Sequence, residues 1–101
     1  MKVVLCTVPP DHAMALARQL VEDEVAACVN LLPEVVSHFR WEGKTQLASE
    51  SLLILKTSDE LLPALEQRLT ELHPYTVPEF VALDPAHVNE PYAAWVNGTG
   101  G

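Results

Sequence analysis

The stretch His73-Pro74-Tyr75-Thr76-Val77-Pro78-Glu79 restricts the backbone of this chain more strongly than any other segment. Pro74 has no N–H to donate, so a helix that reaches Leu72 cannot continue through it. A residue before a proline is driven out of the α region, so His73 and Val77 are expected to be extended. The stretch therefore predicts a stiff elbow that carries an imidazole, a phenol and a carboxylate. Whether this elbow only redirects the chain or also takes part in binding is left open by these residues alone.

Composition predicts one globular domain over residues 1–101, because 49% of the 101 residues are hydrophobic and a chain of this length can bury a core. The net charge of −8 and six scattered Lys and Arg residues argue against nucleic acid as a partner, since phosphate backbones bind clustered cations. An acidic surface attracts cations instead. The last four residues, 98–101, of which three are glycine, are expected to form a disordered tail.

The sequence contains no secretory signal, and the apolar run Val3–Val8 is too short to span a membrane. Cys6 and Cys28 lie far apart and form no C-x-x-C motif. We therefore expect a cytoplasmic protein with two reduced thiols and no membrane partner.

The first half of the chain reads as strand, helix and strand. Val3–Val8 is apolar on both faces, which is typical of a central strand covered on both sides. Asp11 is placed to cap a helix over residues 12–24. A second extended stretch begins at Ala26, and Pro33 predicts a bulge or a sheet edge within it.

A long hairpin is predicted next, because the alternating segment Val35–Trp41 leads through the turn Glu42-Gly43-Lys44 into a strand over Leu47–Thr57. One face of the first arm is apolar. A domain this small has little surface of its own to cover such a stripe, so the hairpin indicates a partner subunit.

The second half repeats the strand–helix pattern. Thr57-Ser58-Asp59-Glu60 has the form of a capping box, although Pro63 competes by favouring a helix start one or two residues later. The helix ends at the elbow, a strand is expected over Phe80–Leu83, and a short helix follows, capped at Asn89 or Glu90. The order β-α-β-β-α-β, with right-handed crossovers, predicts an α+β ferredoxin-like sandwich with a short C-terminal helix.

Several functional classes lack their motifs here. The chain has no G-x-G-x-x-G, no P-loop and no G-x-S-x-G motif. The loop Pro9-Pro10-Asp11 offers a phosphate group few N–H donors and no cation, unlike the loop of the acylphosphatases, which share this topology. The predicted central strands carry no aromatic residues with which to stack RNA bases. The sequence therefore gives no support to these enzyme classes or to an RNA-binding module.

Two kinds of site remain open. Thiols and imidazoles suit copper or zinc, but the cysteines and histidines show no ligand spacing, and only His73 is placed by a rigid segment. Alternatively, the fold could gather polar groups into a pocket. Glu50 and Lys56 share one face of their strand by alternation, and either would need a partner if buried.

A set of short motifs, spread from about Val3 to Val96, occurs in a distinctive order and spacing. The motifs are Leu5-Cys6-Thr7, Leu20-Val21-Glu22, Ala26-Ala27-Cys28-Val29-Asn30, Phe39-Arg40-Trp41-Glu42-Gly43-Lys44, Leu55-Lys56-Thr57, His73-Pro74-Tyr75, Pro78-Glu79 and Tyr92-x-x-Trp95. With these motifs the chain resembles the CutA family of divalent-cation tolerance proteins. The resemblance implies a ferredoxin-like fold and a homotrimer in which extended strands of neighbouring subunits pair.

The resemblance also implies a link to copper and other divalent metal ions. Bacterial relatives are assigned a copper site on a first-strand cysteine and two adjacent histidines before the proline. Cys6 and His73 match the first and last of these positions, whereas Leu72 stands where the other histidine would be. Cys28 is a further thiol that could serve if the fold brings it close. A second group of residues matches a pocket near the subunit boundary: Trp41, Glu50, Lys56, His73 and Tyr75.

The sequence thus predicts a cytoplasmic, non-enzymatic homotrimer that binds copper or another divalent cation weakly and holds no tightly bound cofactor. The candidate metal ligands are Cys6, His73 and Cys28. The alternative is a trimeric sensor of small molecules or anions, similar to the PII signalling proteins. Its pocket would use Trp41, Glu50, Lys56, His73 and Tyr75 at the subunit boundary.

Overall fold

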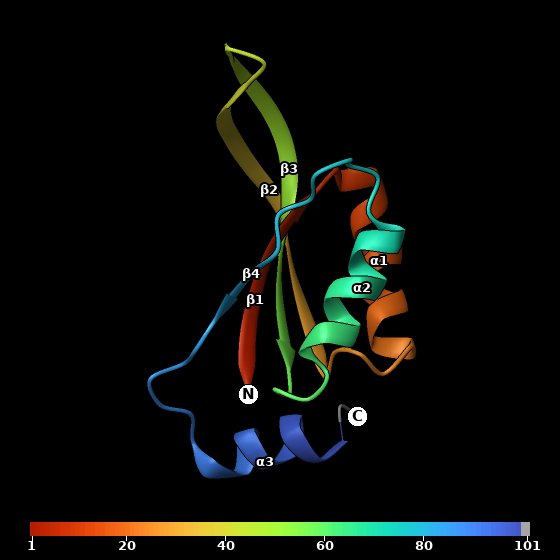
Figure 1. Cartoon of the computed structure of the whole chain (residues 1–101), viewed down its shortest axis with the longest axis vertical. Coiled ribbons are helices and arrows are strands. Elements are labelled where there is room, and N and C mark those ends of the chain that lie inside the picture. Colours follow the sequence, from red (N-terminus) through yellow and green to blue (C-terminus); the bar gives the residue numbers. More distant parts are fainter. Residues whose placement is uncertain (100–101) are drawn as a thin grey trace.

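The computed structural model describes residues 1–99 and confirms the α+β, ferredoxin-like arrangement (Figure 1). Four strands and three helices follow one another in the predicted order. Their bounds are β1 Lys2–Val8, α1 Pro10–Glu22, β2 Cys28–Trp41, β3 Lys44–Thr57, α2 Leu62–Leu72, β4 Val81–Leu83 and α3 Glu90–Thr99.

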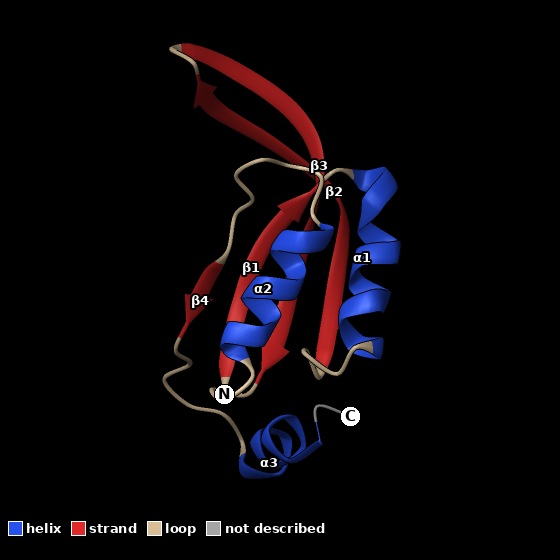
Figure 2. Cartoon of the chain, turned by 45° about the vertical axis from the view of Figure 1, so that its right-hand side comes forward, coloured by secondary structure: helices blue, strands red, loops and turns tan. Residues whose placement is uncertain are grey.

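The four strands form one antiparallel sheet in the order β2-β3-β1-β4. Helices α1 and α2 lie side by side against one face of this sheet, as Figure 2 shows. The core lies between these layers and is built mainly of fully buried leucines and valines of β1, β3, α1 and α2. Its largest members are Leu20, Leu53, Leu55, Leu65 and Leu69.

The other face of the sheet is covered by neither α1 nor α2, so it is only half-buried at Leu5, Leu52 and Ile54. Strand β1 is central, as predicted, but its side chains are fully buried only at Val4, Cys6 and Val8, which point toward the helices. The expectation that both of its faces are covered is therefore wrong for a single chain, because both crossover helices pack on the same side.

The hairpin of β2 and β3 projects well beyond the rest of the domain (Figure 1). A two-residue turn joins its arms, with positive φ at Glu42 (52°) and Gly43 (78°), as a type I′ turn requires. The pairing register shifts between Leu32 and Val35, which confirms the predicted irregularity around Pro33. Bulky side chains near the end of the hairpin are exposed to solvent: Val36, Phe39, Trp41 and Leu47.

The two long helices begin differently from the capping patterns in the sequence. Helix α1 starts at Pro10, and Asp11 lies in its first turn without capping it, because the proline already has helical φ and needs no donor partner. Helix α2 starts at Leu62 with Pro63 in its first turn, so the capping box does not form. Instead the Ser58 hydroxyl accepts the N–H of Leu61 at 3.1 Å.

The C-terminal helix α3 lies across the end of the sheet opposite the hairpin tip (Figure 1). It is anchored by Val96, which is fully buried. Gly98 and Thr99, expected in the disordered tail, belong to this helix, whereas residues 100 and 101 lie outside the described residues. None of the helices within residues 1–99 has the length and apolar character needed to cross a membrane.

Candidate functional site

The elbow after α2 is fastened to the sheet by His73, which is 7% exposed. His73 is extended (φ −75°, ψ 136°), as the following proline predicts. Its Nδ1 accepts the N–H of Tyr75 at 3.1 Å, so Nε2 carries the proton and donates to the carbonyl oxygen of Thr7 at 2.8 Å. The imidazole therefore ties the elbow to the end of β1 with both of its nitrogens.

The phenol of Tyr75 continues this network. Its hydroxyl donates to Oε2 of Glu50 at 2.7 Å, and the two rings of His73 and Tyr75 lie 4.8 Å apart. Burial and then the bond to Glu50 raise the pKa of Tyr75 to about 12, so the phenol stays protonated near neutral pH. Glu50 itself is only 5% exposed. The elbow thus reaches from the end of α2, over β1, to β3.

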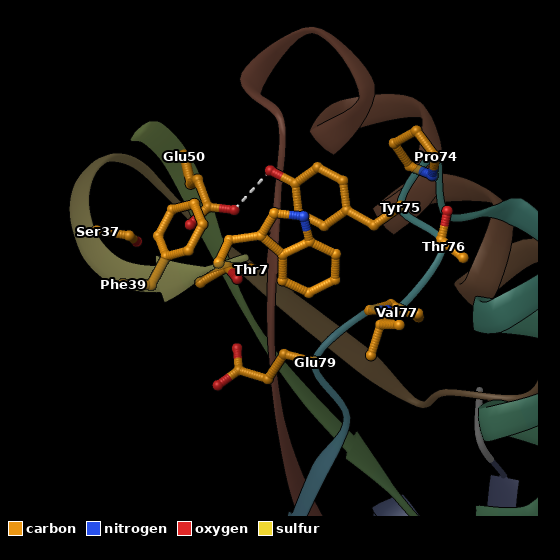
Figure 3. Close-up of a pocket in the computed structure, with 11 residues that line it drawn as sticks. Thr7, Ser37, Phe39, Glu50, Pro74, Tyr75, Thr76, Val77 and Glu79 are labelled. Carbon is orange, nitrogen blue, oxygen red and sulfur yellow. Dashed lines mark hydrogen bonds between the residues drawn. The ribbon is translucent and has the colours of Figure 1, made fainter. Parts of the chain in front are cut away.

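A pocket of about 730 Å³ lies between the elbow and the base of the hairpin (Figure 3). This volume is typical of sites for small molecules. Figure 3 shows the Tyr75 phenol reaching the Glu50 carboxylate, with Glu79 in another part of the pocket. The lining comes from β1 (Thr7), β2 (Ser37, Phe39, Trp41), β3 (Glu50) and the elbow (Pro74, Tyr75, Thr76, Val77, Pro78, Glu79).

Three of the five predicted pocket residues, Trp41, Glu50 and Tyr75, line this pocket, whereas His73 and Lys56 do not. Lys56 pairs with Cys28 at the other end of the hairpin ladder. Its ammonium group bonds the side-chain oxygen of Asn30 and lies 4.0 Å from the sulfur of Cys28. Alternation along β3 does place Glu50 and Lys56 on one face, but six residues apart.

The candidate metal ligands are brought together only in part. The Cys6 thiol donates to the same Thr7 carbonyl that His73 bonds, at 3.5 Å, so these two residues are close neighbours. Burial, helped by the negative charges of Glu79 and Glu50, raises the pKa of Cys6 to about 12, which disfavours the thiolate that binds metal.

Cys28 is remote from this pair. Cys6 pairs with Leu53 on the helix-covered face, whereas Cys28 pairs with Lys56, three residues further along β3 and therefore on the uncovered face. Within residues 1–99, no group of three or more His, Cys, Asp or Glu side chains is arranged to hold a metal ion.

Sequence reasoning missed several lining residues. Ser37 and Phe39 could have been found, because strand alternation places them on the same face as Trp41. Glu79 is part of the elbow that the prolines marked. Thr7 gave no signal in the sequence, since only the pairing of β1 with β3 brings it beside the pocket.

Comparison with known proteins gives consistent matches along the chain. The family model described as "CutA1 divalent ion tolerance protein" matches residues 2–99. The divalent-cation tolerance protein CutA of Thermus thermophilus is 46% identical over 96 residues, which cover 94% of this chain and 93% of that protein. Mouse protein CutA is 44% identical over 85 residues, which cover 84% of this chain and 48% of the mouse protein.

Solved structures agree with this assignment. The structure of the Thermus thermophilus protein superimposes with a TM-score of 0.94 at 45% identity and full coverage of both chains. The structure described as "PII-like protein CutA from Nostoc sp. PCC 7120 in apo form" gives a TM-score of 0.91 at 40% identity, covering 97% of this chain and 95% of that one. The chain therefore belongs to the CutA family of divalent-ion tolerance proteins.

Proposed function

We propose that this chain is the subunit of a cytoplasmic, non-catalytic homotrimer that binds a small ligand in the pocket between the elbow and the hairpin. The observation that carries the proposal is the pocket itself. Side chains from three strands and the elbow converge on about 730 Å³ of space, and a hydrogen-bonded network holds the elbow against the sheet. The likeness to a CutA protein described as PII-like supports a ligand-responsive role rather than catalysis.

The trimer is supported by the sheet face that no helix covers. Leu32, Val81 and Leu83 are each more than 40% exposed there, and the projecting hairpin adds further apolar surface. The half-buried Leu5, Leu52 and Ile54 lie on the strands between these side chains, so the face is apolar across the sheet, and a second and third copy would bury it. Thr7 and Glu50 belong to this face as well, so the pocket would lie close to the subunit boundary.

Multi-angle light scattering tests the assembly. We expect the mass of three chains for the wild type and a smaller mass for Leu32→Asp, which places a charge on the uncovered face. Met14→Asp is the matched control, because Met14 is exposed on α1, away from that face. A wild-type monomer at micromolar concentration would refute the trimer.

Thermal shift tests the pocket. A ligand that binds only the folded state raises the melting temperature by mass action. We expect one class of small organic compound to do so, and expect Trp41→Ala to abolish the shift, because the indole forms part of the pocket wall. The absence of any shift with organic cations, anions or neutral compounds would contradict the proposal.

Weak binding of copper or another divalent cation is a second candidate. It is favoured by the contact of both Cys6 and His73 with the Thr7 carbonyl, which keeps a thiol and an imidazole adjacent. Binding there would have to break the hydrogen bonds of both groups, which is why we propose low affinity. Titration with Cu(II) and Zn(II) should show weaker binding in Cys6→Ala and His73→Ala, with Cys28→Ala as the comparison. If the affinity for metal is unchanged in all three variants, none of these residues is a metal ligand.

A further inference from the structure

The pocket contains negative charge that the chain does not neutralise. Glu50 is 5% exposed, and its partner is the phenol of Tyr75, which is uncharged. Within residues 1–99, no ion pair involves Glu50 or Glu79. A carboxylate this deeply buried normally has a cationic partner, because removing its charge from water is costly.

The rest of the lining offers no positive charge either. None of the lining residues is Lys, Arg or His. Lys56, the cation predicted for this pocket, lies at the other end of the hairpin ladder beside Asn30. The field of both carboxylates also extends to β1, where Glu79 and Glu50 add to the effect of burial on the Cys6 thiol. An anionic ligand would therefore meet this charge with no counter-charge from the subunit that forms the pocket.

The remaining walls are largely aromatic. Phe39, Trp41 and Tyr75 line the same pocket as Glu50, and Figure 3 shows the Tyr75 phenol joined to the Glu50 carboxylate by a hydrogen bond. Aromatic faces attract organic cations through their quadrupole, most strongly for Trp. A hard divalent cation instead needs several oxygen ligands at once. No such cluster of three or more acidic, His or Cys side chains exists among the described residues.

We propose that the pocket of Glu50, Glu79, Trp41, Phe39 and Tyr75 binds a small organic ammonium ion. The carboxylates supply the counter-charge and the aromatic rings contact the carbon atoms around the nitrogen. This inference rests on the proposed function, since it names the chemical class of the ligand of the same pocket. It also differs from the sensor predicted from the sequence, for which an anion was one candidate ligand.

Binding is measured by calorimetry on the purified full-length protein in an amine-free phosphate buffer. The probes are choline, tetramethylammonium and n-butylammonium. The neutral compound 3,3-dimethylbutan-1-ol has the shape of choline without its charge, and acetate and benzoate represent anions. We expect at least one ammonium probe to bind, and the neutral analogue to bind at least about tenfold more weakly, as desolvated cation–π and carboxylate contacts imply.

Matched variants locate the site. Glu79→Gln changes an exposed side chain, and Glu50→Gln keeps an oxygen that can accept the Tyr75 hydroxyl, so both are expected to fold. Each should weaken ammonium binding by about tenfold, because a charge-assisted contact becomes a neutral one. Glu66→Gln is the control, since it removes the same charge from an exposed position on α2 outside the pocket. Its affinity should match that of the wild type.

Three results would overturn the inference. If the neutral analogue or an anion binds as tightly as the ammonium probes, the pocket binds ligands but is not selective for cations, and only the inference fails. If an ammonium probe binds equally well to Glu50→Gln and Glu79→Gln, its site is elsewhere. If no organic probe of any charge binds at millimolar concentration, the pocket function proposed above fails together with the inference.

Discussion

Replacing His73 with alanine tests whether this histidine holds the elbow in place. The substitution removes the Nε2–H bond to the Thr7 carbonyl (2.8 Å) and the Nδ1 acceptor of the Tyr75 N–H (3.1 Å). It also removes a ring that lies 4.8 Å from the ring of Tyr75. Because His73 is 7% exposed, water reaches the freed backbone groups only if the elbow shifts.

The expected loss of stability follows from these contacts. Each lost hydrogen bond costs about 0.5–1.5 kcal/mol, and more if its partner stays buried without a replacement. The ring contact adds about 0.5–1.5 kcal/mol. We therefore expect His73→Ala to lower the free energy of unfolding by about 2–4 kcal/mol.

Urea denaturation followed by circular dichroism measures this change at one fixed protein concentration, because the stability of an oligomer depends on concentration. His12→Ala is the control: His12 is exposed and bonds only its neighbour Asp11, so its loss should cost less than about 0.5 kcal/mol. His73→Asn offers an acceptor near the Nδ1 position and His73→Gln a donor near the Nε2 position, so each should restore part of the stability. If His73→Ala were as stable as His12→Ala, the structural role of this imidazole would be refuted.

Three further predictions concern other residues. Cys6 should react with a thiol reagent much more slowly than Cys28, because burial keeps the pKa of Cys6 near 12. At mildly alkaline pH, Cys28→Ser reports the rate of Cys6 and Cys6→Ser reports the rate of Cys28; equal rates would contradict the prediction. The pKa of Tyr75 is raised from 10 to about 12 on folding, so its contribution to stability is complete below pH 10 and is lost as the pH rises toward 12. The stability difference between wild type and Tyr75→Phe should shrink over that pH window, and a constant difference would show that the phenol does not titrate there. At Gly43 and Gly98 alike, an added methyl group would meet no other atom within 4 Å, so only the backbone conformation distinguishes the two positions. In a urea titration, Gly43→Ala should cost about 1–2 kcal/mol because φ is +78°, whereas Gly98→Ala in α3 should be neutral or stabilising by up to about 1 kcal/mol. A loss at Gly98 as large as at Gly43 would contradict the backbone explanation.

The sequence by itself determined the elements of the fold, because their signals are local. Alternation predicts the arms of the hairpin, Gly43 marks the tight turn, and Pro33 marks the irregularity in β2. Pro74 ends α2 and sets the extended conformation of His73. The helix starts were less accurate. Helix α1 begins at Pro10 without the cap expected from Asp11, and α2 begins at Leu62, as the competing Pro63 indicated, without the capping box.

Tertiary structure alone decided which side chains meet. Strand alternation correctly placed Glu50 and Lys56 on one face. Six residues of extended chain nevertheless separate them by about 20 Å, and only the pairing of β3 with β2 shows that Glu50 lies at the pocket and Lys56 does not. Cys6 and Cys28 likewise lie on opposite faces of the sheet, a separation that residue type cannot reveal.

The same reasoning applies to the pocket. Thr7, Glu50 and Glu79 are distant in sequence and become neighbours of one space because β1 pairs with β3 and the elbow crosses over both. The prolines made the elbow rigid, but two long-range hydrogen bonds, from His73 to β1 and from Tyr75 to β3, fix where the elbow lies against the sheet. Local backbone preferences act over a few residues, whereas the charge and shape of a binding pocket depend on contacts between strands that the sequence pattern does not specify.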